Sequence, residues 1–101
     1  MPRGPGSLNT ELPPAGRQRL DKWLVYARFV KTRSLAQDLV TAGRVRINAE
    51  RASRPDRMVG PGDTLTLGLP HATLVVEILS LAEKRGSAPE AQKLYVIVQP
   101  D

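Results

Sequence analysis

The sequence predicts a single α+β domain, with two helices first, several strands after them and a short helix near the end. Apolar residues recur at helical spacing through residues 19–42, and they alternate with polar residues in later segments. The stretch 87–94 begins with a Ser-Ala-Pro-Glu pattern that is typical of a capped helix start. A chain of 101 residues that is 41% hydrophobic can form one modest core.

The first sixteen residues differ in composition from the rest of the chain. They contain four Pro and three Gly and show almost no apolar periodicity, so residues 1–16 are expected to be a disordered tail. Residues 17–98 then form the single domain. The tail lacks the apolar core of a secretory signal, and no apolar run approaches a membrane span, so the cytoplasm is the expected location.

The first helix is predicted from Arg19 to Val30. Its apolar positions follow the i, i+3, i+4, i+7 spacing and define one buried face, which holds Leu20, Trp23, Leu24 and Ala27. Trp23 lies on that face, and we expect it to pack in the core rather than stack on a base.

The second helix is predicted from Lys31 to Ala42. Thr32 or Ser34 can cap its start, and Gly43 can end it in a left-handed conformation. Its buried stripe is expected to consist of Leu35, Ala36, Leu39 and Val40. The connection between the two helices is very short, which makes them neighbours.

Strands are predicted after Gly43. In the first, Val45 and Ile47 point one way and alternate with Arg44, Arg46 and Asn48. A weak strand over 50–55, a strong turn at 60–63, a strand over 64–67, a turn at 68–71 and a long strand over 74–81 follow. Residues 95–98 fit either a helix end or a strand.

The positive charge is confined to one part of the chain. The net charge is +5, yet residues 17–57 hold eleven Lys and Arg against four Asp and Glu, a formal charge of +7. This distribution indicates a polyanionic partner, which is RNA, DNA or an acidic membrane surface. A membrane partner is disfavoured because the apolar helix faces are needed for the small core.

Catalytic chemistry has little support in the sequence. The chain has no Cys and a single histidine, His71, in a predicted loop without a partner base or acid. Metal-ligand clusters and phosphate-cradling glycine loops are also missing from the sequence. Asp21 and Asp38 are interpreted as salt-bridge partners, with Asp21 one turn from Arg17. We therefore expect neither catalysis nor a metal or other cofactor.

The basic segment does offer phosphate chemistry. A helix start presents unpaired N–H groups, and the second helix begins with Lys31, Thr32, Arg33 and Ser34. Arg44 and Arg46 would lie about 7 Å apart on one strand face, close to the spacing of successive phosphates. Arg51 and Arg54 can extend the same surface, and a guanidinium holds phosphate with two hydrogen bonds.

Several of these motifs together resemble a known family, the RNA-binding domain of ribosomal small-subunit protein four, here called the S-four domain. The matching stretches are Arg19-Leu20-Asp21, Thr32-Arg33-Ser34, Gly43 and Val45-Arg46-Ile47-Asn48-Ala49. Residues 21–36 and 86–91 further resemble the stand-alone bacterial group that contains the fifteen-kilodalton heat-shock protein. The resemblance covers about residues 17–95.

The resemblance implies an S-four, or alpha-L, fold: two packed helices against a small, mostly antiparallel curved sheet. It also implies non-catalytic binding of structured RNA, either ribosomal RNA or tRNA. For the heat-shock group it implies association with large ribosomal subunits stalled with nascent chain, under stress. We expect a monomer. The expected RNA-binding residues are Arg19, Lys22, Arg28, Lys31, Thr32, Arg33, Ser34, Gln37, Arg44, Arg46, Asn48, Arg51 and Arg54.

One position departs from the family pattern. The family usually has Gly where this chain has Ala49, and Ala tolerates a positive φ poorly. The turn is therefore expected to be looser or differently shaped, which leaves the placement of Asn48 and Arg51 open.

Two alternative functions stay open at this point. The helix-helix-strand unit can bind duplex DNA through charge alone, without sequence preference. S-four domains also occur fused to pseudouridine synthases, so the chain can be an RNA-binding accessory of a modifying enzyme. In those enzymes the catalytic motif contains Arg-Leu-Asp, but here Asp21 is followed by Lys-Trp-Leu rather than Thr-Ser-Gly.

Overall fold

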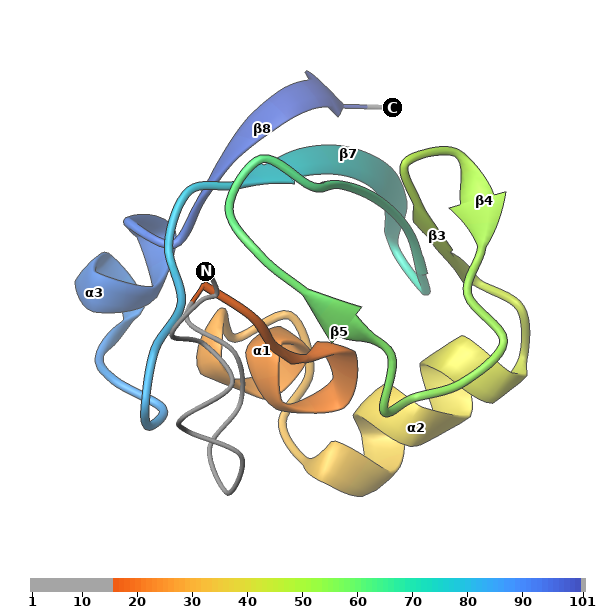
Figure 1. The fold of residues 1–101 in the computed structure, drawn as a ribbon, viewed down its shortest axis with the longest axis horizontal. Helices are drawn as coiled ribbons and strands as arrows, with labels where there is room; N and C mark the ends of the chain where they lie inside the picture. The colour runs from red at the N-terminus through yellow and green to blue at the C-terminus, as the bar shows by residue number, and fades with distance from the viewer. Residues whose placement is uncertain (1–15, 101) are drawn as a thin grey trace, which may run out of the picture.

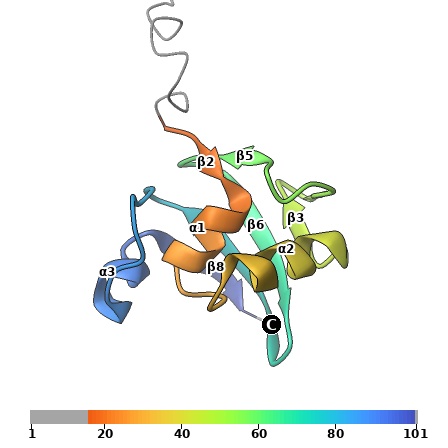
Figure 2. The ribbon, with the colours of Figure 1, turned by 90° about the horizontal axis from the view of Figure 1, so that it is seen from below.

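The computed structural model describes residues 16–100, so the predicted tail lies almost entirely outside the described residues. The described chain has an α+β fold in which helices α1 and α2 cover one face of a five-stranded antiparallel sheet (Figures 1 and 2). The predicted fold class is confirmed. Within residues 16–100, every helix is too short or too polar to span a bilayer.

Helix α1, Leu20–Tyr26, buries the face that the sequence predicted. Trp23 is fully buried, and its indole N–H donates to the Ser80 carbonyl at 3.1 Å. The predicted end at Val30 is wrong, because Arg28 adopts φ 65° and stops the helix early. The N–H groups of Arg28 and Phe29 bond back to the carbonyls of Val25 and Leu24, which is the Schellman pattern that usually carries glycine.

Helix α2, Arg33–Thr41, is capped by Thr32, whose hydroxyl accepts from the Leu35 N–H at 3.1 Å. The helix therefore starts later than predicted, and Ser34 is not the cap. Gly43 ends it with φ 79°, as predicted.

Two further expectations about α2 are corrected by the structure. Leu35 is 48% exposed, so the predicted buried stripe holds for Ala36 and Val40 but not for Leu35. Residues 27–32 separate the two helices, so the connection is longer than expected, although α1 and α2 are neighbours as predicted.

The main sheet has the strand order β4-β3-β6-β7-β8, and every neighbouring pair is antiparallel. Its inner face is built from fully buried side chains, which include Val45, Ile47, Leu65, Leu67, Val76 and Ile78. The strands are β3 (Val45–Ile47), β4 (Glu50–Arg51), β6 (Thr64–Leu69), β7 (Ala72–Ile78) and β8 (Tyr95–Pro100).

Two strand predictions need adjustment, and one open assignment is decided by the structure. The weak strand expected over 50–55 is only Glu50–Arg51, and the long strand over 74–81 runs instead over 72–78. Residues 95–98, which fitted helix or strand, belong to β8.

A second, two-stranded sheet was not predicted. Strand β2 (Gln18–Arg19) pairs with β5 (Met58–Val59) just before α1 begins. The carbonyls of Arg57 and Pro55 accept from the Leu20 and Asp21 N–H groups at 2.8 and 3.1 Å. The chain after β4 therefore leaves the main sheet to cap α1, which has no side-chain cap of its own.

The turn between β3 and β4 is tight. Asn48 and Ala49 have φ values of 52° and 74°, as a two-residue type I′ hairpin requires. The expectation of a looser turn is therefore wrong. The Asn48 side chain fixes the turn to the next strand, since its amide donates to Asp63 Oδ1 and its oxygen accepts from the Thr64 N–H.

The short helix α3, Ala88–Gln92, begins with the predicted capping box between Ser87 and Glu90. In both ribbon views α3 lies at one end of the molecule and α2 at the other (Figures 1 and 2). Strands β3 and β4 lie beside α2, so these parts of the basic segment lie at the end opposite the C-terminal helix (Figure 1).

Candidate nucleic-acid interface

A buried carboxylate organises part of the predicted RNA-binding set. Asp21 has no exposed surface, and its two oxygens accept five hydrogen bonds. Arg19 donates from Nε at 3.1 Å and from Nη2 at 2.8 Å, and Arg33 Nη2 lies at 3.4 Å. Gln37 Nε2 donates at 3.2 Å and the Lys22 backbone N–H at 2.8 Å. One residue of α1 thus gathers three side chains that the sequence assigned to RNA binding.

The charges in this cluster stabilise one another. Burial raises the pKa of Asp21, but hydrogen bonds from Arg19 and Gln37, with the charges of Arg19 and Arg33, outweigh it and hold the pKa below its ordinary value. The hydrogen bond to Asp21 likewise raises the pKa of Arg19. Asp21 is therefore ionised at neutral pH. The predicted ion pair between Asp21 and Arg17 is wrong, because Asp21 pairs with Arg19 and Arg33 instead.

A second group of cations lies on the β3–β4 hairpin. Arg46 is exposed at the centre of β3 and stands directly opposite Arg51 on β4. Like charges at directly opposed strand positions repel each other, and an anion bound between them would relieve the repulsion. The Arg51 guanidinium lies against Gly43, where a Cβ atom would collide with it. The hairpin thus carries two arginines at paired strand positions, at the same end of the molecule as α2.

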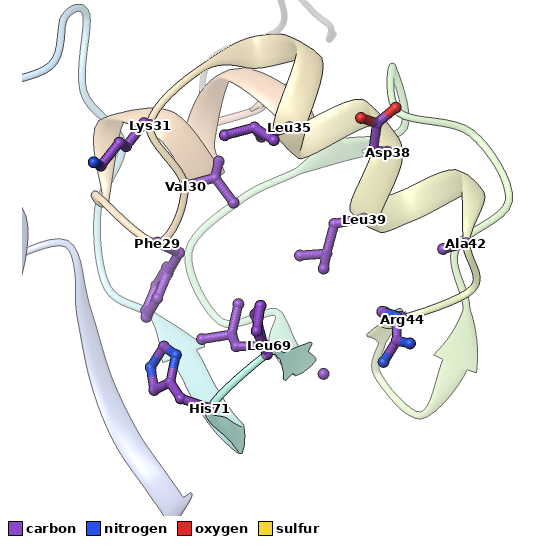
Figure 3. A pocket seen from close by; sticks show the side chains of 12 residues that line it. Phe29, Val30, Lys31, Leu35, Asp38, Leu39, Ala42, Arg44, Leu69 and His71 are labelled. Atoms are coloured by element: carbon purple, nitrogen blue, oxygen red, sulfur yellow. The ribbon is translucent and has the colours of Figure 1, made fainter.

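Two more predicted cations flank an apolar groove of about 710 Å³. Lys31 and Arg44 stand at its opposite ends, with Leu35, Leu39 and Leu69 between them (Figure 3). Leu35 is exposed because its side chain lines this groove, which runs between α2 and the turn that joins β6 to β7. Asp38 and His71 also line it, and Asp38 forms no ion pair within residues 16–100.

Some predicted residues have partners elsewhere in the fold. Arg54 forms an ion pair with Asp56 at 2.9 Å. Arg28 donates to the Gly86 carbonyl at 2.6 Å, just before α3 begins. Both side chains therefore have partners outside the Asp21 cluster.

Only some of the predicted RNA-binding residues at the start of α2 are available to a ligand. The Thr32 hydroxyl is used as the helix cap, whereas Ser34 and Arg33 are exposed on the first turn. Lys22 is half-buried beside the Asp21 cluster. The structure therefore brings together Arg19, Arg33 and Gln37 around Asp21, and places Arg44, Arg46 and Arg51 on the neighbouring hairpin.

Sequence analysis interpreted Asp21 as a salt-bridge partner but missed Arg33 and Gln37, because they lie 12 and 16 residues away and no local pattern reports such a contact. Arg57 was not among the predicted RNA-binding residues. It lines a shallow hollow of about 260 Å³ with Ser53, Arg54 and Asp56.

The described side chains offer little for catalysis. Residues 16–100 contain no group of three or more His, Asp or Glu that could hold a metal ion. The Asp21 carboxylate is enclosed by its own donors, so a substrate cannot reach it. What this end of the molecule can do chemically is bind anions with guanidinium groups.

Comparisons with known proteins agree with this geometry. The family model described as S4 domain matches residues 18–65, which hold α1, α2 and the β3–β4 hairpin. A solved structure of Vibrio cholerae heat shock protein 15, described as trimeric, superposes with a TM-score of 0.77. It is 44% identical in sequence, and the match covers 81% of this chain and 82% of that one.

Curated relatives fall into two groups. The heat shock protein 15 homolog of Aeromonas salmonicida is 46% identical over 77 residues, which are 76% of this chain and 58% of that protein. The chain thus spans about three fifths of the length of these relatives. The RQC P-site tRNA stabilizing factor of Bacillus subtilis is 32% identical over 83 residues, 82% of this chain and 94% of that protein.

Proposed function

Because the chain belongs to the S4-domain family, we propose that it binds structured RNA through the α2 and β3–β4 end and catalyses no reaction. The observations that carry this proposal are the pairing of Arg19 and Arg33 with Asp21 and the position of Arg46 and Arg51 on the hairpin, which lies beside α2 (Figure 1). Several guanidinium groups on one surface suit the repeating phosphates of RNA.

The proposed partner is ribosomal RNA, tRNA or both on the large ribosomal subunit. The proposed role is recycling or rescue of stalled subunits that carry a nascent chain, in the cytoplasm and under stress. Support comes from the names of the relatives, which are heat shock protein 15 and a factor that stabilises P-site tRNA. The alignment covers 94% of the second relative, which supports carrying its printed role over to this chain.

The first test is Arg46→Ala. Arg46 is exposed and makes no ion pair among the described residues, so its loss removes a phosphate contact without disturbing the core. Affinity for isolated large ribosomal subunits carrying peptidyl-tRNA should fall by about three- to tenfold, with an unchanged melting temperature.

Arg85→Ala is the matched control. It removes the same charge from the opposite end of the molecule, next to α3, and should leave affinity unchanged. Equal losses from the two variants would mean that net charge, rather than this surface, determines binding.

Duplex DNA of equal length, added as competitor at physiological salt, separates RNA binding from general polyanion binding. Equal competition by DNA and RNA would favour the alternative of a sequence-independent DNA binder. Because the Vibrio cholerae relative is described as trimeric, sedimentation of the free protein should accompany these measurements to test the expectation of a monomer.

A further inference from the structure

If the chain binds RNA as proposed, the buried carboxylate of Asp21 lies beside the RNA-binding surface, and the following inference rests on that function. A negative charge beside an RNA-binding surface repels phosphate, so an acid here should weaken binding. Yet Asp21 is the fully buried centre of the cluster, and its side-chain donors are Arg19, Arg33 and Gln37.

The geometry around Asp21 leaves donors free for a ligand. The Nη2 atoms of Arg19 and Arg33 both lie within reach of Asp21 Oδ2, at 2.8 and 3.4 Å, so the two guanidinium groups are side by side. Their side chains remain 38% and 46% exposed. Each guanidinium has five N–H donors, of which Asp21 takes two from Arg19 and one from Arg33.

We propose that Asp21 is a positioning residue for RNA binding, which holds Arg19 and Arg33 together as a preformed site for backbone phosphate. An arginine side chain loses rotamer freedom when it binds, and this loss weakens affinity unless the side chain is ordered beforehand. Asp21 orders two such side chains at once, from β2 and from α2. Asp21 thus strengthens RNA binding by ordering these side chains, although its negative charge by itself would weaken it.

The fold contains a matched pair for comparison. Asp56 accepts two hydrogen bonds from Arg54, at 3.0 and 2.9 Å, but it holds only this one arginine and the pair is open to solvent. Asp56 is 43% exposed, against none for Asp21. An exposed pair of this kind orders its side chains weakly.

The test compares Asp21→Asn with Asp56→Asn. Each variant makes the protein one unit more positive, so an effect of charge alone would tighten RNA binding in both. The proposal expects Asp21→Asn to bind large ribosomal subunits roughly five- to tenfold more weakly and Asp56→Asn to bind as well as wild type or better. Tighter binding by a folded Asp21→Asn would overturn it.

The salt dependence of affinity gives a readout that a purely structural role would not change. If Asp21 positions a phosphate contact, the log–log slope of affinity against salt should become shallower by roughly 1 in Asp21→Asn. In an Arg19→Ala, Arg33→Ala background, Asp21→Asn should cause no further loss of affinity, and a further loss of equal size would contradict the proposal.

A second variant covers the case in which Asp21→Asn does not fold. Arg33→Lys keeps the charge at an exposed position but loses the planar fork, so it should bind several-fold more weakly, while Arg85→Lys should bind normally. Wild-type affinity in Arg33→Lys would then overturn the proposal. If the wild-type protein itself does not bind the subunits, the proposed function fails. If the wild-type protein binds and the variants bind equally well, this inference alone fails.

Discussion

At the scale of single residues, the turn between β3 and β4 shows a backbone that its sequence does not favour. Ala49 has φ 74°, in the left-handed region where a Cβ atom approaches the following carbonyl. The register of Arg46 opposite Arg51 depends on this two-residue turn. The two-sided hydrogen bonding of Asn48 to Asp63 and Thr64 helps to hold it.

Replacing Ala49 by Gly should therefore stabilise the protein. Gly adopts the observed φ without steric strain, and we expect a gain of about 1 kcal/mol in the free energy of unfolding, measured with urea. Ala42→Gly is the control, because Ala42 is exposed and already has φ −76°. Its stability should stay the same or fall, and a gain equal to that of Ala49→Gly would rule out strain at the turn.

At the scale of elements, the ends of α1 and α2 use the same geometry with different residues. Both helices close with a Schellman pattern, but the left-handed residue is Arg28 in one and Gly43 in the other. Arg28 is supported by its bond to the Gly86 carbonyl, which comes from a distant part of the chain. The start of α2, by contrast, is held by Thr32 within the same segment.

Thr32→Ala should weaken α2 at the end that carries Arg33. Loss of the hydroxyl leaves the Leu35 N–H without its partner and should cost about 1 kcal/mol of stability, read as a lower denaturation midpoint. Thr32→Ser keeps the acceptor and should remain close to wild type. Equal stability in all three proteins would show that this hydrogen bond does not support the helix.

At the scale of the whole molecule, α2 with the β3–β4 hairpin lies at one end and α3 at the other (Figures 1 and 2). The segment 17–57, with its formal charge of +7, supplies α1, α2 and the β3–β4 hairpin. Strands β7 and β8 and helix α3 come from the remainder, and α3 lies at the end opposite α2 (Figures 1 and 2). A polyanion is therefore expected to bind preferentially at the end that holds α2 and the hairpin.

RNA binding should depend steeply on salt. If about five phosphate contacts form, the slope of log affinity against log salt should be roughly −3.5 to −4.5, because each contact releases counterions. Binding to large ribosomal subunits at several potassium chloride concentrations measures this slope. A nearly flat dependence would mean that apolar contacts, such as those available in the groove beside Leu35, dominate the affinity.

The fold was predictable wherever local pattern and tertiary structure agree. The apolar face of α1, the Gly43 stop, the alternation in β3 and the capping box of α3 are all as expected. The early end of α1 could not be foreseen, since apolar spacing continues past Arg28 and no glycine marks the stop. Strands β2 and β5 were missed because each has only two residues and gains its partner from a distant segment.

The candidate site was predictable in composition but not in arrangement. The basic segment and the family motifs pointed to Arg19, Arg33 and Arg46, and the structure places the first two at Asp21 and the third on the hairpin beside α2. The contact of Arg28 with Gly86 could not be read from the sequence, because the two residues lie 58 positions apart.

The sequence by itself determined where the three helices and most strands of the main sheet lie, and that nearly all the excess charge lies between residues 17 and 57, because periodicity and composition are properties of the chain. Only the tertiary structure decided which partners the charged side chains contact. Folding buries Asp21 between α1 and α2, where low exposure and distant donors turn an ordinary helix acid into the centre of an arginine cluster. Contacts between residues far apart in the chain, such as Asp21 with Arg33, form only when the helices pack.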